Sequence, residues 1–187
     1  MGLALCALAL PRAGWAQAPG TADTVGRGYK LFGGYSFLSN SFHHTSGTSY
    51  QPLNGWDASI TGPLTSRVGL KLEASGYYGT NSGSPQHPLF FLGGGEYSRR
   101  VGRETVFAEG LAGLGHLNAN WWGGEFPGKT ISFAADAGGG LDTPLGPRLA
   151  LRIQGDFQYS NFTVPDNQIH GLPNYFARLI TGFVWRF

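Results

Sequence analysis

The final stretch of the chain, residues 174–187, alternates in polarity with a period of two. One set of alternate positions is almost entirely apolar or aromatic, and it comprises Tyr175, Ala177, Leu179, Thr181, Phe183, Trp185 and Phe187. The other set carries Arg178 and Arg186 among apolar and small residues. A period of two predicts a β-strand rather than a helix. The last element is therefore expected to be a strand with one apolar face that has aromatic side chains at both ends.

Seven further segments share this alternation: residues 29–38, 54–62, 68–79, 89–100, 105–117, 131–142 and 149–159. Each has about ten residues, which is the length that a tilted strand needs to cross a bilayer. The connections alternate between long ones (39–53, 80–88, 118–130, 160–173) and short ones (63–67, 101–104, 143–148). Such alternation is typical of a barrel with short turns on the periplasmic side and long loops outside. The pattern predicts an all-β chain that forms an eight-stranded antiparallel up-and-down transmembrane β-barrel.

Charged side chains fall on the face of these segments that would point into the barrel. They are Lys30, Asp57, Lys71, Glu73, Glu96, Glu109, Asp136, Arg152, Asp156 and Arg178, together with Asp142 and Arg186. An eight-stranded barrel is just wide enough for side chains to fill it, so these charges are expected to form a buried network of ion pairs. The alternative is an ion path or gate, which is less favoured because a filled lumen leaves little continuous water.

The C-terminus resembles the signal by which outer-membrane barrels are recognised for insertion, with Gly182 followed by Trp185 and Phe187. Ile180 stands where that signal usually has a polar residue. Residues 29–187 as a whole resemble small bacterial outer-membrane barrels of the OmpA/OmpX kind, which are porin-like in architecture. The resemblance implies a Gram-negative cell envelope, a lipid bilayer with lipopolysaccharide, and biogenesis with periplasmic chaperones and the barrel-assembly machinery. The peptidoglycan-binding domain of OmpA-type proteins is expected to be absent.

The beginning of the chain is expected to be a secretory signal peptide, residues 1–18. Its apolar run is too short to span a membrane, and small residues allow cleavage after either Ala16 or Ala18. Cys6, the single cysteine, lies within this segment, so the exported chain would contain no disulfide.

Composition and motifs argue against several other functions. A net charge of +2 and 13% charged residues do not favour nucleic-acid binding. The glycine runs at 93–95 and 138–140 lack the lysine and flanking helix of a phosphate-binding loop, and are better explained by strand curvature and close packing in the lumen. No cofactor or metal site is expected, because the histidines lie in predicted loops or near a strand end and have no ligand spacing: His43, His44, His87, His116 and His170.

The sequence leaves the role of the barrel open among several classes. A structural or surface-interaction role without enzymatic activity is favoured, with a ligand for the long loops that the sequence does not identify. A narrow channel for small solutes is the main alternative. A lipid-modifying enzyme would need Ser132 or Ser160 to act with His116. A soluble barrel of lipocalin type would have an apolar lumen and a polar exterior. Trp121 and Trp122 are expected at the headgroup interface rather than in a ligand site.

Overall fold

The computed structural model describes residues 28–39, 52–81, 84–119, 130–161 and 174–187. These residues form eight strands, and each strand pairs antiparallel with its neighbours in sequence. The strands are β1 (Lys30–Leu38), β2 (Leu53–Pro63), β3 (Val68–Asn81), β4 (Ser84–Val101), β5 (Glu104–Ala119), β6 (Thr130–Pro144), β7 (Leu149–Ser160) and β8 (Asn174–Arg186). In the described part of the chain, no helix is long and apolar enough to cross a membrane.

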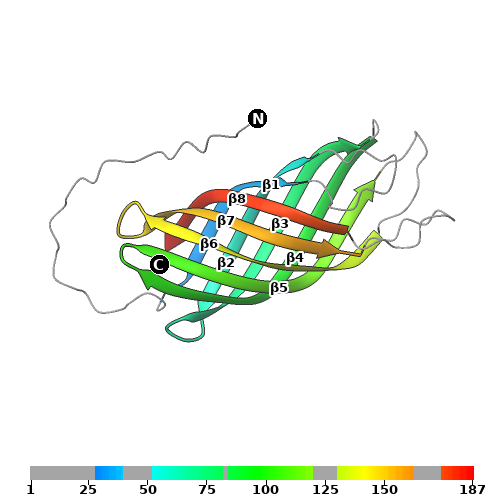
Figure 1. Cartoon of the computed structure of the whole chain (residues 1–187). Coiled ribbons are helices and arrows are strands. Elements are labelled where there is room, and N and C mark those ends of the chain that lie inside the picture. Colours follow the sequence, from blue (N-terminus) through cyan, green and yellow to red (C-terminus); the bar gives the residue numbers. More distant parts are fainter. Residues whose placement is uncertain (1–27, 40–51, 82–83, 120–129, 162–173) are drawn as a thin grey trace, which may run out of the picture.

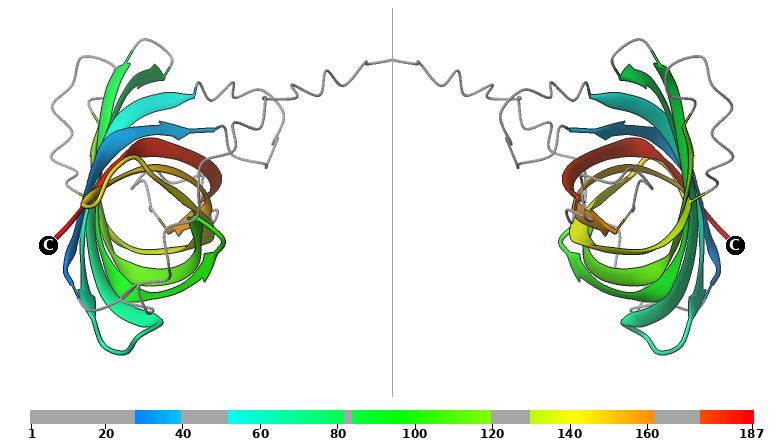
Figure 2. Two further views of the ribbon diagram at one scale, coloured as in Figure 1. Left: turned by 90° about the vertical axis from the view of Figure 1, so that its left-hand side faces the viewer. Right: turned by 90° about the vertical axis from the view of Figure 1, so that its right-hand side faces the viewer.

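The sheet closes on itself because β1 also pairs with β8, from Lys30 opposite Arg186 to Leu38 opposite Arg178. Figure 2 shows the resulting ring along its axis. Closure gives every strand two hydrogen-bonded neighbours and leaves no open sheet edge, which is the condition for placing strands in hydrocarbon. The predicted eight-stranded antiparallel barrel is confirmed.

The short turns and the C-terminus lie at one end of the barrel, which we call the turn end (Figure 1). In the β4–β5 turn, Gly102 adopts a φ of 64° and the turn has two residues between the paired Val101 and Glu104. Glycine tolerates this left-handed conformation at no steric cost. In the β2–β3 turn, Thr65 Oγ1 accepts hydrogen bonds from the backbone N–H groups of Arg67 at 3.2 Å and Val68 at 3.0 Å.

One predicted loop is wrong. Residues 80–88 were expected to form a long loop, but β3 continues to Asn81 and β4 begins at Ser84, and these two residues pair directly. The segment is rich in Gly, Ser, Asn and Pro, a composition that favours loops and disfavours strands. Backbone pairing of β4 with both β3 and β5 overrides that local preference, so His87 lies in a strand opposite Asn118 and not in a loop. The other predicted strands end within two residues of the observed ones.

The outer surface of the barrel is apolar, whereas its interior combines charged and polar side chains with two small apolar clusters. Large hydrophobic side chains exposed on the outside include Leu31, Ile60, Leu70, Leu72, Phe91, Leu114, Phe133, Ile153, Phe157, Leu179 and Phe183. The strands bury lysine, arginine, aspartate and glutamate on the opposite face. This is the inverse of the arrangement that a soluble lipocalin-like barrel requires, so that alternative is wrong.

Exposed aromatic residues lie toward both ends of the barrel. Tyr175 is near the loop end of β8, where its ring lies 5.3 Å from that of Tyr159, and Trp185 is near the turn end. With about 3.3 Å per residue and a tilt of about 45°, these two positions are separated by roughly 23 Å along the barrel axis. This matches the apolar band of about 25 Å, flanked by aromatic girdles, that transmembrane barrels present to lipid.

Candidate functional site in the barrel lumen

The lumen is filled by charged and polar side chains that converge from all eight strands. Arg152 and Lys71 are among the largest fully buried side chains of the described residues. Two groups can be distinguished by their ion pairs. We call them the Arg178 cluster (Asp57, Lys71, Glu73, Glu109, Asp136, Asp156 and Arg178) and the Arg152 cluster (Lys30, Glu96, Asp142, Arg152 and Arg186).

Arg178 on β8 holds the first cluster together. Its Nη2 lies 2.7 Å from Glu73 Oε1 and 3.0 Å from both Asp136 Oδ2 and Asp156 Oδ2. Its Nη1 lies 3.3 Å from Asp57 Oδ2. The four carboxylates come from β2, β3, β6 and β7, so a single guanidinium links strands from opposite sides of the ring.

Arg178 Nη1 also donates to two hydroxyl groups on β3, Ser75 Oγ and Tyr77 Oη, each at 3.4 Å. The Tyr77 hydroxyl in turn lies 2.9 Å from Ser36 Oγ on β1. Five fixed donor positions allow an arginine to serve several acceptors at once, which a point charge such as lysine cannot do with the same geometry.

Lys71 connects the cluster to the next layer of the lumen. Its Nζ lies 2.8 Å from Glu73 Oε2, and 2.8 and 2.9 Å from the two carboxylate oxygens of Glu109. Gln154 Nε2 donates to Glu109 Oε1 at 2.9 Å and to Asp156 Oδ2 at 2.8 Å. These contacts make one continuous hydrogen-bonded layer across the barrel.

The Arg152 cluster lies on the turn side of the first. Arg152 Nε donates to Asp142 Oδ1 at 2.7 Å, and Nη2 donates to Asp142 Oδ2 at 3.1 Å. Both Arg152 terminal nitrogens reach Glu96 Oε2 at 3.4 Å. Two residues nearer the turn end complete the cluster, because Lys30 pairs with Glu96 and Arg186 lies 3.3 Å from Asp142.

Arg152 also stacks on aromatic rings that share the inward face. The guanidinium carbon lies 3.9 Å from the centre of the Phe107 ring and 5.4 Å from that of Phe32. Cation–π contacts of this kind are stronger where the cation is shielded from water. Phe107 lies on the same strand face as Glu109, so its inward position followed from the alternation. Its contact with Arg152, which is two strands away on β7, did not.

Formal charges differ between the two clusters. The Arg178 cluster contains two cationic and five acidic side chains, whereas the Arg152 cluster contains three cationic and two acidic ones. Among the described residues, Asp57 Oδ1, Asp136 Oδ1 and Asp156 Oδ1 accept no hydrogen bond from a protein group. Acidic side chains are therefore in excess in the middle of the lumen, and basic side chains are in excess toward the turn end.

The ten residues predicted for the lumen network all lie on the inward face, and each takes part in at least one ion pair. Lys30 is the most exposed of them, with 19% of its side chain accessible. The alternation also placed Gln154, Ser75 and Tyr77 on the charged face, and the structure adds them to the network as neutral hydrogen-bonding partners.

The residues proposed for a hydrolase are not assembled into a catalytic pair. Ser132 Oγ donates to the backbone carbonyls of Phe133, at 3.3 Å, and Asn161. In the described part of the chain, His116 Nε2 and Ser160 Oγ are buried without a hydrogen-bond partner. A nucleophile requires a base within hydrogen-bonding reach, and neither serine has a hydrogen bond to one among the residues that the structure describes. No metal-holding group of His, Cys, Asp or Glu occurs among the described residues.

The three residues of the predicted insertion signal do not share one face. Trp185 and Phe187 are exposed on the outer surface at the turn end, whereas Gly182 is inward and packed against β1. A Cβ at Gly182 would lie 2.4 Å from Gly34 Cα, so glycine is required by the close approach of the two strands. His43, His44, Trp121, Trp122 and His170 lie outside the described residues, as does the predicted signal peptide.

An apolar outer face, a closed antiparallel ring and a charged lumen define this chain as an eight-stranded β-barrel of the transmembrane type. No protein-family model and no curated protein matches its sequence.

Several solved structures share the fold. Neisserial surface protein A is 11% identical, with a TM-score of 0.59 over 86% of this chain and 96% of that one. The N-terminal β-barrel domain of Pseudomonas aeruginosa OprF is 19% identical, with a TM-score of 0.52 over 86% and 99%. P. aeruginosa outer membrane protein H is 16% identical, with a TM-score of 0.52 over 84% and 99%. The chain therefore has the fold of small bacterial outer-membrane barrels.

Proposed function

We propose that this protein is an integral outer-membrane barrel whose lumen is closed by its own side chains, and that it has a structural or surface-interaction role without catalytic activity. Residues 1–18 would direct export and be removed, leaving residues 29–187 as the barrel. The lipid bilayer and lipopolysaccharide would be its surroundings, and periplasmic chaperones and the barrel-assembly machinery its partners during biogenesis. Gly182, Trp185 and Phe187 would contribute to the insertion signal.

The observation that carries this proposal is the position of Arg178. Its guanidinium contacts carboxylates on four other strands and so crosses the lumen. Removing one partner from a buried ion pair costs about 3–5 kcal/mol, so displacing this side chain to open a water path would be strongly unfavourable. A filled lumen supports a function carried out by the outer wall or the loop end of the barrel, and it argues against transport through the lumen.

The distinguishing experiment is single-channel recording in planar bilayers with the refolded barrel. We expect no discrete conductance steps from the wild type. Steps that scale with voltage would instead establish the narrow channel and refute the closed lumen. Arg103→Met is the control, since Arg103 is exposed in the β4–β5 turn and does not face the lumen. Arg178→Met is expected to raise membrane leak, provided that the folded fraction is matched by heat-modifiability on a gel.

Membrane location and enzymatic activity need separate tests. We expect the expressed chain in the outer-membrane fraction, migrating faster on a gel before boiling than after it. Recovery as a soluble periplasmic protein would contradict the proposal. Lipid modification predicts a mass change in lipid A on expression, and we expect none.

A further inference from the structure

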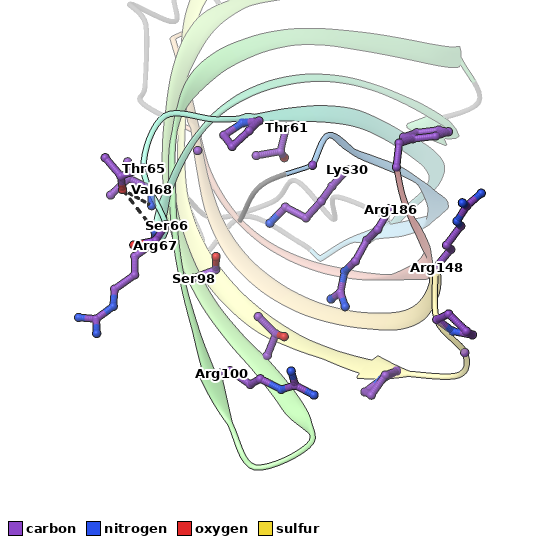
Figure 3. Close-up of a pocket in the computed structure, with 18 residues that line it drawn as sticks. Lys30, Thr61, Thr65, Ser66, Arg67, Val68, Ser98, Arg100, Arg148 and Arg186 are labelled. Atoms are coloured by element: carbon purple, nitrogen blue, oxygen red, sulfur yellow. Dashed lines mark hydrogen bonds between the residues drawn. The ribbon is translucent and has the colours of Figure 1, made fainter. Parts of the chain in front are cut away.

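The turn end of the barrel contains a cavity of about 500 Å³, which lies beyond the Arg152 cluster (Figure 3). We call it the turn-end cavity. The described lining contains no aspartate or glutamate side chain, and it includes five cationic residues from five different parts of the chain: Lys30, Arg67, Arg100, Arg148 and Arg186. Its volume is within the range of small-molecule sites.

The cations occupy two positions relative to the opening. Lys30 and Arg186 extend into it, whereas Arg67 and Arg148 point away at its two edges (Figure 3). Arg100 lies on the rim at the end of β4. Lys30 and Arg186 share their charge with the carboxylates of Glu96 and Asp142. Within the described residues, Arg67, Arg100 and Arg148 form no ion pair.

Neutral hydrogen-bond donors complete the lining. Thr61, Ser98 and Thr105 also line the cavity, and all three are buried in the strand walls. Hydroxyl groups and arginine side chains donate hydrogen bonds to phosphate oxygens. A concave site in which cationic side chains predominate also concentrates anions from solution.

We infer that the turn-end cavity binds a phosphate-bearing anion, held by Lys30, Arg100 and Arg186 with Ser98 as a neutral donor. This goes beyond the proposed structural role and does not depend on whether the lumen conducts. The anion could be a soluble phosphate compound or the headgroup of a phospholipid in the adjoining leaflet, because the chemistry at the cavity is the same.

The first probe is inorganic pyrophosphate, titrated calorimetrically into the full barrel refolded in an uncharged maltoside detergent that contains no phosphate. We expect saturable binding that weakens as sodium chloride is raised, since exposed charges are screened. Arg100→Gln should weaken it roughly tenfold, the loss expected for one charge-assisted hydrogen bond. Arg100 makes no ion pair among the described residues, so this variant should fold normally.

Arg103→Gln is the matched control, because Arg103 lies in the adjacent turn and does not line the cavity. It removes the same charge from the same end of the barrel and should change affinity less than twofold. An equal loss in both variants would show general charge attraction and overturn the site. Heat-modifiability of each variant confirms that affinities are compared between folded barrels.

The second probe is short-chain phosphatidylglycerol added to the same micelles, with native mass spectrometry as the readout. Retention of pyrophosphate alone assigns a soluble ligand, and retention of the lipid that is weakened by Arg100→Gln assigns a headgroup. The inference fails if neither probe binds saturably, or if both bind without sensitivity to Arg100.

Discussion

Arg178 is the residue on which the lumen depends most. It is the partner of four buried carboxylates that already outnumber the cations around them. An uncharged side chain of similar length would leave these carboxylates with Lys71 as the remaining cation of the cluster. Repulsion among them and loss of hydrogen bonds would then act together.

We therefore expect Arg178→Met to lower the free energy of unfolding by about 3–5 kcal/mol. The measurement is reversible urea unfolding in lipid vesicles, followed by tryptophan fluorescence. Arg148→Met at the exposed turn should stay within about 0.5 kcal/mol of the wild type. Similar values for the two variants would mean that the ion pairs around Arg178 contribute little net stability.

Glycine at position 138 is required by close packing inside the barrel. A Cβ placed there would lie 2.0 Å from Asp156 Oδ1 and 2.4 Å from the backbone carbonyl oxygen of Gly155. The carboxylate belongs to the Arg178 cluster, so it cannot move without weakening its ion pairs.

Gly138→Ala should accordingly cost about 1–3 kcal/mol in the same unfolding assay, the range found for overpacked interiors. Gly155→Ala is its control, because a Cβ at Gly155 meets nothing within 4 Å. Equal stability of the two variants would refute steric exclusion as the reason for glycine at position 138.

At the scale of single strands, polarity alternation defines which side chains meet lipid. Leu179 on β8 is 56% exposed on the outer face, near the middle of its strand. Leu64 is 64% exposed but lies in the turn after β2. The two leucines are thus similarly accessible and differ in depth.

Leu179→Arg should destabilise the barrel by roughly 2–4 kcal/mol in vesicles, whereas Leu64→Arg should cost about 0–1 kcal/mol. Unfolding titrations of both variants in the same lipid give the comparison. Equal costs would indicate that Leu179 does not lie in the hydrocarbon region.

The strands themselves were largely predictable, and the reason lies in their chemistry. An inward face that must be polar and an outward face that must be apolar leave a strict period of two, as in β7, where Arg152, Gln154, Asp156 and Gln158 are buried between more exposed apolar residues. Extension of the β3–β4 hairpin was missed because Pro85 and Pro88 favour loops locally, whereas pairing is decided by the neighbouring strands.

Which side chains pair with one another inside the lumen could not be predicted from the sequence. Arg178 and Asp57 are 121 residues apart, and their contact depends on how far each strand is shifted relative to the next around the ring. Alternation assigns both residues to the inner face, but it does not determine their positions along the barrel axis. The contact between Arg152 and the Phe107 ring depends on the same shifts between neighbouring strands.

At the scale of the whole molecule, the middle of the lumen and its turn end differ in formal charge. Acidic groups dominate the middle, and five cations line the cavity at the turn end. This polarity along the axis belongs to no single strand, because each strand supplies only one or two of the charges. It appears only when the ring closes and brings eight strands into one interior.

Closure has a further consequence for chain connectivity. The backbone N–H of Phe187 donates to the Tyr29 carbonyl at 3.0 Å, so the start of β1 and the end of β8 are neighbours. A short linker could therefore join them, and new termini could be opened in the turn between Pro144 and Leu149 without disturbing any strand pair. Such a circular permutant should refold in detergent like the parent, yet its chain would no longer end in Trp185 and Phe187. Comparing its refolding in vitro with its insertion in cells would separate the features that the barrel needs in order to fold from the C-terminal residues that the cell needs in order to insert it.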